Sequence, residues 1–303
     1  MTVNPVGLLS SVAGALSSGS YAAGWAVVRG MPEPVARRIF QAGADLAAVR
    51  GGDGVDRLRA NLQRVAPGED LVRAGLRSYA RYWCEAFRLP AMTADRIVGG
   101  THTIGEDDFR EAIAAASGTI MVLPHTGNWD AAGAWCGLTG VPFTTVAERL
   151  RPESLYERFV AFRESLGMEV LALTGGDRPP YEVLAERLSA GGTICLLADR
   201  DLTPRGIDVR FFGATARMPA GPARLALETG ARLIPTTLGF VGEREWEITF
   251  HPAVEPSDLA TMTQDVADAF EKGIARHPAD WHMLQRLWLD DLADDDPRKQ
   301  PRS

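Results

Sequence analysis

The chain has 303 residues, of which 46% are hydrophobic and 23% charged, as in an ordinary globular protein. Its 32 basic and 39 acidic residues give a formal net charge of −7, which argues against wholesale binding of nucleic acid. Cys84, Cys136 and Cys195 are widely spaced and form no C-x-x-C pair, so neither a disulfide framework nor a structural zinc site is expected, and each is expected to be a small core residue.

The first charged side chain is Arg29, so residues 1–28 form one uncharged stretch. Serines and glycines dilute its apolar residues too much for a convincing transmembrane span, and no basic segment precedes it as in a secretory signal. One interpretation is a helix in the membrane interface, because Tyr21 and Trp25 would share a face that suits the headgroup boundary. The other is a helix packed on its own domain, and the sequence leaves both open.

Residues 5–90 are predicted to be helical, because apolar residues recur with a period near 3.6. From about residue 118, short apolar runs alternate with amphipathic segments. The strands expected from these runs are residues 119–124, 142–147, 168–173, 193–198 and 233–238, and the helices are residues 129–136, 152–166, 181–190, 221–229 and 261–276. Residues 246–250 alternate in polarity and are expected as an antiparallel strand near an edge.

Alternating strands and helices indicate βαβ units. The prediction is therefore an α/β fold with a mostly parallel central sheet flanked by helices on both faces, and with a helical N-terminal cap. We expect one domain over residues 1–303, with a helical part at residues 1–90 and an α/β core at residues 91–292. The acidic tail at residues 293–303 is expected to be disordered.

Polar side chains follow three of the predicted strands at the point where each strand ends. They are His125, then Glu148 with Arg149, and then Asp199 with Arg200 and Asp201. Because reactive groups gather at the carboxyl ends of parallel strands, these side chains are expected to face one site.

The run from His125 to Asp130 (HTGNWD) predicts a tight turn followed by the start of a helix. Gly127 permits a tight reversal, and Asn128 is a plausible N-cap for the helix that follows. The carboxylate of Asp130 could fold back toward the imidazole of His125, hold its tautomer and leave the other ring nitrogen free to take a proton.

Other catalytic motifs are absent from the sequence: it has no G-x-S-x-G elbow, no phosphate-binding G-x-x-x-x-G-K-[ST] loop and no H-E-x-x-H zinc motif. Without a candidate covalent nucleophile, direct transfer fits best, with His125 deprotonating an acceptor hydroxyl that attacks a thioester carbonyl.

The HTGNWD run resembles the H-x4-D motif of the glycerolipid acyltransferase superfamily, in the form used by bacterial lipid A acyltransferases. The closer resemblance is to actinobacterial phosphatidylinositol mannoside acyltransferases. Further blocks that carry it are residues 143–150, 152–156, 163–167, 175–180, 217–222 and 277–285. Together the resemblance covers about residues 20–292.

The resemblance implies a long-chain acyl-CoA donor such as palmitoyl-CoA, used as a co-substrate without any other cofactor. The implied acceptor is a mannose hydroxyl of a phosphatidylinositol mannoside, at the cytoplasmic face of the plasma membrane, where the protein would be peripheral. His125 matches the catalytic base, Asp130 completes the motif, and Glu148 and Arg163 match acceptor-side positions.

One residue departs from the resemblance. The acidic partner of the histidine is usually Glu in the mycobacterial members, whereas this chain has Asp199. Because the side chain is one methylene shorter, either the backbone compensates, a water bridges the gap, or Asp130 takes a larger share of the role.

Four arginines are weaker candidates for binding phosphates of CoA or of the inositol lipid, and the favoured interpretation of each is a surface or ion-pair arginine: Arg149, Arg163, Arg200 and Arg210. Trp281 and His282 are expected to pack a C-terminal helix against the core. A metal-dependent glycosyltransferase that uses Asp199 and Asp201 is the alternative enzyme, although no metal site is expected, and a lipid-binding protein without enzyme activity is the alternative class.

Overall fold

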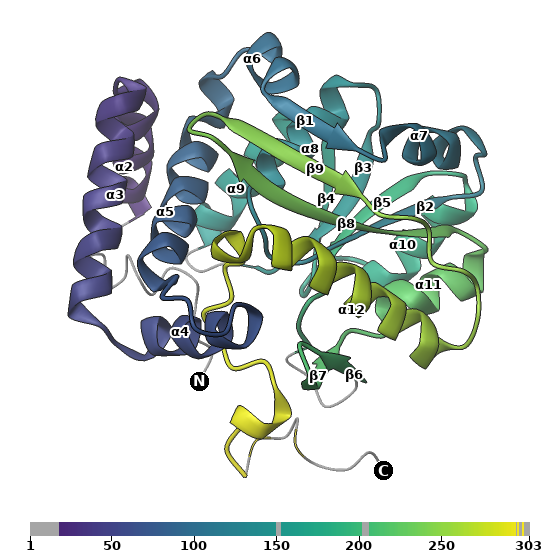
Figure 1. The fold of residues 1–303 in the computed structure, drawn as a ribbon. Coiled ribbons are helices and arrows are strands. Elements are labelled where there is room, and N and C mark those ends of the chain that lie inside the picture. Colours follow the sequence, from purple (N-terminus) through teal and green to yellow (C-terminus); the bar gives the residue numbers. More distant parts are fainter. Residues whose placement is uncertain (1–17, 150–152, 202–205, 295, 297–298, 300–303) are drawn as a thin grey trace.

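The computed structural model describes residues 18–149, 153–201, 206–294, 296 and 299, and a seven-stranded sheet forms its centre (Figure 1). The strands lie in the order β1-β9-β8-β2-β5-β3-β4. Their bounds are β1 Thr101–Ile104, β2 Thr119–Leu123, β3 Phe143–Ala147, β4 Met168–Ala172, β5 Thr193–Leu197, β8 Arg232–Val241 and β9 Glu245–Phe250. Neighbours are parallel except β8 and β9, so the prediction of a mostly parallel sheet is confirmed.

Helices cover both faces of this sheet, as the alternation of the sequence predicts. Their bounds are α2 Ser18–Gly30, α3 Glu33–Arg50, α4 Asp53–Val65, α5 Val72–Arg88, α6 Ala94–Gly99, α7 Glu106–Ala114, α8 Trp129–Leu138, α9 Glu153–Ser165, α10 Pro180–Ser189, α11 Gly221–Thr229 and α12 Leu259–Arg276. Short 3-10 turns lie at Leu89–Ala91, Pro278–Asp280 and Leu289–Asp291.

Strand β2 shows how the sequence specifies the two layers. All five of its side chains are buried, and successive side chains point to opposite faces. Ile120 and Val122 pack with α10, α11 and α12, whereas Met121 and Leu123 pack with α7, α8 and α9. A continuous apolar run is therefore required here, because β2 lies between two hydrophobic cores.

Two parts of the fold differ from the prediction. Residues expected as a loop form an antiparallel hairpin of β6 (Ile207–Phe211) and β7 (Ala214–Met218), which packs on α12. The edge strand beside β9 is β1, for which no strand is predicted, because its four residues are half-exposed and carry no long apolar run.

The N-terminal helices stand side by side at one end of the molecule (Figure 1). The ring of Trp25 in α2 packs against Phe87 of α5 and against Phe159 and Phe162 of α9, and its indole N–H donates to the carbonyl of Phe87 at 3.0 Å. For Trp25, packing on the protein itself is therefore the interpretation that the structure supports.

Within the part of the chain that the structure describes, no helix is both long and apolar enough to cross a membrane. Residues 1–17 of the uncharged stretch lie outside the described residues, as does most of the acidic tail.

Candidate active site

His125 and Asp199 meet where β2 and β5 end. The two strands are neighbours with Leu123 paired to Leu197, and the amide of Ala198 continues the ladder by donating to the carbonyl of Leu123 at 2.8 Å. Directly beyond, the backbone N–H of His125 donates to Oδ2 of Asp199 at 2.9 Å, and Nδ1 of His125 lies 2.5 Å from Oδ1. The aspartate therefore reaches the histidine directly.

The carboxyl group of Asp199 is ionised beside the imidazole of His125. Asp199 is fully buried, and burial alone would raise the pKa of its carboxyl group; the charge of His125 and the hydrogen bonds from His125 and Trp281 lower that pKa from 3.8 to about 2. The ionised carboxylate can accept a hydrogen bond from Nδ1 of the imidazole. In the neutral tautomer that makes this hydrogen bond, Nε2 is the unprotonated nitrogen, on a side chain that is 19% exposed.

A third donor to Asp199 comes from the segment after α12. The indole Nε1 of Trp281 donates to Oδ2 of Asp199 at 3.0 Å. The expectation that Trp281 and His282 lie in a helix is wrong, because Trp281 forms an antiparallel bridge with Thr126 and the N–H of His282 donates to the carbonyl of His125 at 2.8 Å. The chain is extended here because the turn after β2 offers it backbone partners.

Asp130 does not take the role expected for it beside His125. One of its oxygens accepts from Nε of Arg163 at 2.8 Å and the other from the hydroxyl of Tyr82 at 2.9 Å. A carboxylate buried in the first turn of α8 needs a charged partner, and Arg163 of α9 supplies it. Asp130 is thus the centre of a second buried network, which anchors α8 to α5 and α9.

The turn between His125 and α8 is built as its sequence predicts. Gly127 has φ +54°, and a Cβ there would lie 2.9 Å from Cβ of Leu238 in β8, so only glycine fits. Asn128 is the N-cap of α8, and its side-chain oxygen accepts from the amide of Ala131 at 3.0 Å.

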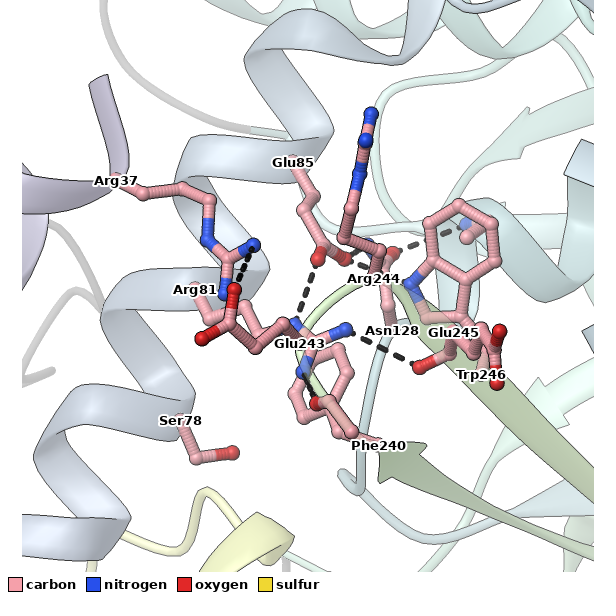
Figure 2. Close-up of polar contacts among 12 residues, drawn as sticks. Arg37, Ser78, Arg81, Glu85, Asn128, Phe240, Glu243, Arg244, Glu245 and Trp246 are labelled. Atoms are coloured by element: carbon pink, nitrogen blue, oxygen red, sulfur yellow. Dashed lines mark hydrogen bonds and ion pairs between the residues drawn. The ribbon is translucent and has the colours of Figure 1, made fainter. Parts of the chain in front are cut away.

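The amide group of Asn128 is in turn held by Glu85 of α5 (Figure 2). Oε2 of Glu85 accepts from Nδ2 of Asn128 at 2.9 Å and from the indole of Trp246 at 2.7 Å, while Oε1 accepts from Arg81 at 2.6 Å. Three elements, α5, β9 and α8, therefore meet at the N-terminus of α8.

His282 lies beside this site in a buried aromatic environment. Its Nε2 is 2.9 Å from the hydroxyl of Ser78, which donates to Asp280 at 2.7 Å. Burial, and next the nearby charge of His125, lower the pKa of His282 to about 3, so this ring is neutral at physiological pH.

The remaining predicted residues lie around this centre in different environments. Glu148 follows β3, the neighbour of β5, and is exposed, without a hydrogen bond to another described residue. Arg200, next to Asp199, is half-buried and has no hydrogen bond to the described part of the chain. Arg149 forms an exposed ion pair with Glu153, and Arg210 is exposed on the β6–β7 hairpin.

An apolar cavity of about 20 Å³ lies between α8 and the sheet. Its lining includes Trp129, whose ring lies 5.7 Å from that of His125, and Phe143 of β3. The thiols of Cys136 and Cys195 also line it; burial raises the pKa of both, that of Cys195 to about 12, so both are protonated at neutral pH. Neither thiol is therefore a good nucleophile.

The donor set does not suit a divalent metal. Both oxygens of Asp199 accept hydrogen bonds from His125 or Trp281, and the residues that the structure describes contain no group of three or more His, Cys, Asp or Glu side chains that could hold an ion. The metal-dependent alternative thus gains no support from the geometry.

Local sequence patterns do not predict three of the residues that hold this site in place, because these residues lie far from His125 in the sequence. They are Tyr82, Glu85 and Trp281. The one signal that could have pointed to Trp281 is its place in the block at residues 277–285, which carries part of the family resemblance.

A family model and three known proteins match this chain over most of its length. Residues 16–290 match the family model described as bacterial lipid A biosynthesis acyltransferase. A phosphatidylinositol mannoside acyltransferase of Mycolicibacterium smegmatis is 54% identical over 283 residues, which cover 91% of this chain and 92% of that protein. Proteins of the same name from two strains of Mycobacterium tuberculosis are each 50% identical over 300 residues, which cover 94% of this chain and 92% of theirs.

Proposed function

This chain belongs to the bacterial lipid A biosynthesis acyltransferase family, and we propose that it transfers a long-chain acyl group from acyl-CoA to a mannose hydroxyl of a phosphatidylinositol mannoside. Palmitoyl-CoA is the proposed donor. The observation that carries the mechanism is the direct contact of His125 with the buried carboxylate of Asp199, which leaves Nε2 of the histidine available as a base.

In the proposed reaction, Nε2 of His125 takes the proton of the acceptor hydroxyl as its oxygen attacks the thioester carbonyl carbon. The tetrahedral intermediate collapses with cleavage of the C–S bond, and the proton on Nε2 passes to the departing CoA sulfur. Asp199 stays ionised throughout and stabilises the transient imidazolium, as expected of a carboxyl group whose pKa is about 2.

Three further residues support substrate binding in this proposal. Arg200 is half-buried and follows Asp199 directly along the chain, and we assign it to a phosphate of CoA or of the inositol lipid. Glu148 is exposed at the end of the neighbouring strand and suits the hydroxyls of the acceptor. Trp129 places the apolar cavity next to His125, where an acyl chain is expected to enter.

That cavity has room for about one water molecule. An acyl chain of sixteen carbons would therefore require the side chains around the cavity to move apart, which favours a pocket that opens as the donor binds.

An exposed apolar face on α3 supports a peripheral location at the inner leaflet of the plasma membrane. Val35, Ile39, Leu46 and Val49 recur at helical spacing, and each is more than two-fifths exposed. A contiguous apolar face of this kind suits a lipid surface, which is where the proposed acceptor resides.

The decisive variant is His125→Ala. We expect transfer of radiolabelled palmitoyl from palmitoyl-CoA to fall by about 10²–10⁴-fold, because the base is lost. His102→Ala is the matched control, because His102 is exposed on the edge strand β1, which β9 and β8 separate from β2, and pairs with Glu245 there. This variant should retain wild-type transfer.

Wild-type transfer by His125→Ala would refute the mechanism. A panel of glycolipid acceptors with product mapping tests the acceptor separately: acylation of another glycolipid, with none of the mannoside, would overturn the acceptor and leave the role of His125 standing. Loss of activity in EDTA with recovery in Mn²⁺ would favour the metal-dependent alternative.

A further inference from the structure

We propose that Trp281 is a positioning residue of the active site, whose indole N–H holds the Asp199 carboxylate in the orientation that engages His125. This inference rests on the proposed role of His125. It adds Trp281 to the pair of His125 and Asp199, from a segment 82 residues beyond Asp199 along the chain.

The two oxygens of Asp199 have different partners, and this difference fixes the carboxylate. Oδ2 accepts from the backbone N–H of His125 at 2.9 Å and from the indole of Trp281 at 3.0 Å, which leaves Oδ1 facing Nδ1 of the imidazole at 2.5 Å. Without the indole, Oδ2 would keep one donor, and the orientation of the carboxylate would depend on His125 alone, through its backbone N–H and Nδ1.

Trp281 is itself held from two sides. Its side chain is fully buried and packs edge-to-face on the rings of Phe211 and Trp288. Its backbone forms the bridge to Thr126, in the same turn that carries His125. The indole is therefore fixed relative to both the histidine and the β6–β7 hairpin.

The electrical surroundings of the pair make this donor important. Asp199 is buried, His282 is neutral, and the nearby carboxylate of Asp130 is already paired with Arg163. Arg200 follows Asp199 along the chain but has no hydrogen bond to it. Apart from the charge of His125, the buried carboxylate of Asp199 is stabilised by three N–H groups, and Trp281 supplies one of them.

Trp281→Phe keeps an aromatic ring and removes the N–H. We expect kcat to fall about 10-fold, the value of one hydrogen bond to a charged group, with little change in KM for palmitoyl-CoA. The control is Trp25→Phe, because Trp25 also donates its indole N–H to a backbone carbonyl, that of Phe87 at 3.0 Å, and packs against α5 and α9 without contact to Trp281 or Asp199. It should retain kcat.

A second readout does not depend on activity. The proton shared between Nδ1 of His125 and Asp199 should give a far-downfield NMR signal, identified by its loss in His125→Ala. Trp281→Phe should shift or broaden this signal, and Trp25→Phe should leave it in place. If Trp281→Phe does not fold, benzothienylalanine at position 281 replaces the N–H by sulfur with almost the same shape.

An unchanged signal and an unchanged kcat in the variant at position 281 would overturn the proposal. If Trp281→Phe shifts the signal but His125→Ala still transfers acyl groups at the wild-type rate, the proposed function is wrong and the positioning role of Trp281 stands. In that case Trp281 orients Asp199, but the reaction does not use His125.

Discussion

The register of β2 and β5 determines how far the side chain of Asp199 must extend to contact His125. Because Leu123 pairs with Leu197, His125 and Asp199 leave the sheet at the same level, and a side chain with one methylene suffices to contact both the amide and the imidazole of His125. Of the three ways to accommodate the shorter residue, the structure supports compensation by the backbone, because Asp199 contacts His125 directly. The oxygens of Asp130 are bonded to Tyr82 and Arg163 instead.

Substitutions at Asp199 should separate charge from length. Asp199→Asn should lower kcat by about 10²-fold or more, because the imidazolium formed in the reaction loses its counter-charge. Asp199→Glu keeps the charge and should retain more activity than Asn, although the longer side chain must shift relative to Trp281. The measurement is kcat for palmitoyl transfer in both variants, and equal rates for Asn and wild type would remove Asp199 from the mechanism.

At the scale of elements, the N-terminus of α8 depends on a buried carboxylate from another helix. Asn128 uses its oxygen for the helix cap and its amide for Glu85, and Glu85 is also held by Arg81 and Trp246 (Figure 2). Asparagine is required because one side chain must accept and donate at the same time.

Asn128→Asp tests this dual requirement. Aspartate is as good an N-cap as asparagine in an ordinary helix, yet here it would place a second carboxylate against buried Glu85. We expect a loss of about 2 kcal/mol in the free energy of unfolding, since a buried hydrogen bond is replaced by repulsion between like charges.

The matched control is Asp258→Asn at the N-cap of α12, where the side-chain oxygen accepts from the amides of Ala260 and Thr261 in an exposed setting. Urea denaturation should show little change for this variant. A similarly small change for Asn128→Asp would show that the contact with Glu85 does not constrain residue 128.

At the scale of the whole molecule, two neutral histidines should make the fold sensitive to acid. Burial lowers the pKa of His282 from 6.5 to about 3 and, followed by the charges of Lys272 and Arg276, that of His251 to about 4. The unfolded chain binds protons at these histidines below pH 6.5 and the native state does not, so stability is highest above pH 6.5 and decreases as pH falls toward 4.

The slope should approach about 1.4 kcal/mol per pH unit for each such histidine, measured as the free energy of unfolding in urea between pH 7 and 4.5. His251→Asn should flatten the slope, because one of the titrating groups is gone. The same slope in this variant and in the wild type would assign the acid sensitivity to other groups.

The sequence by itself determined the layers of the fold and the identity of the proposed base. Apolar runs of strand length such as residues 119–123 can be buried only between two helical layers, and the order of strands and helices then requires a mostly parallel sheet. Gly127 and Asn128 are equally local, because a positive φ and a helix cap depend on residues within one turn.

Only the tertiary structure decided which groups surround the proposed base, His125. Asp130 is five residues from His125, yet it bonds to Arg163. Asp199, far along the chain, contacts the imidazole, and Trp281, farther still, donates to Asp199. The physical reason is that strand order and register place side chains from separate segments at one edge of the sheet, and a buried carboxylate takes the donors that lie nearest in space. Neither strand register nor the path of the segment after α12 can be obtained from local periodicity.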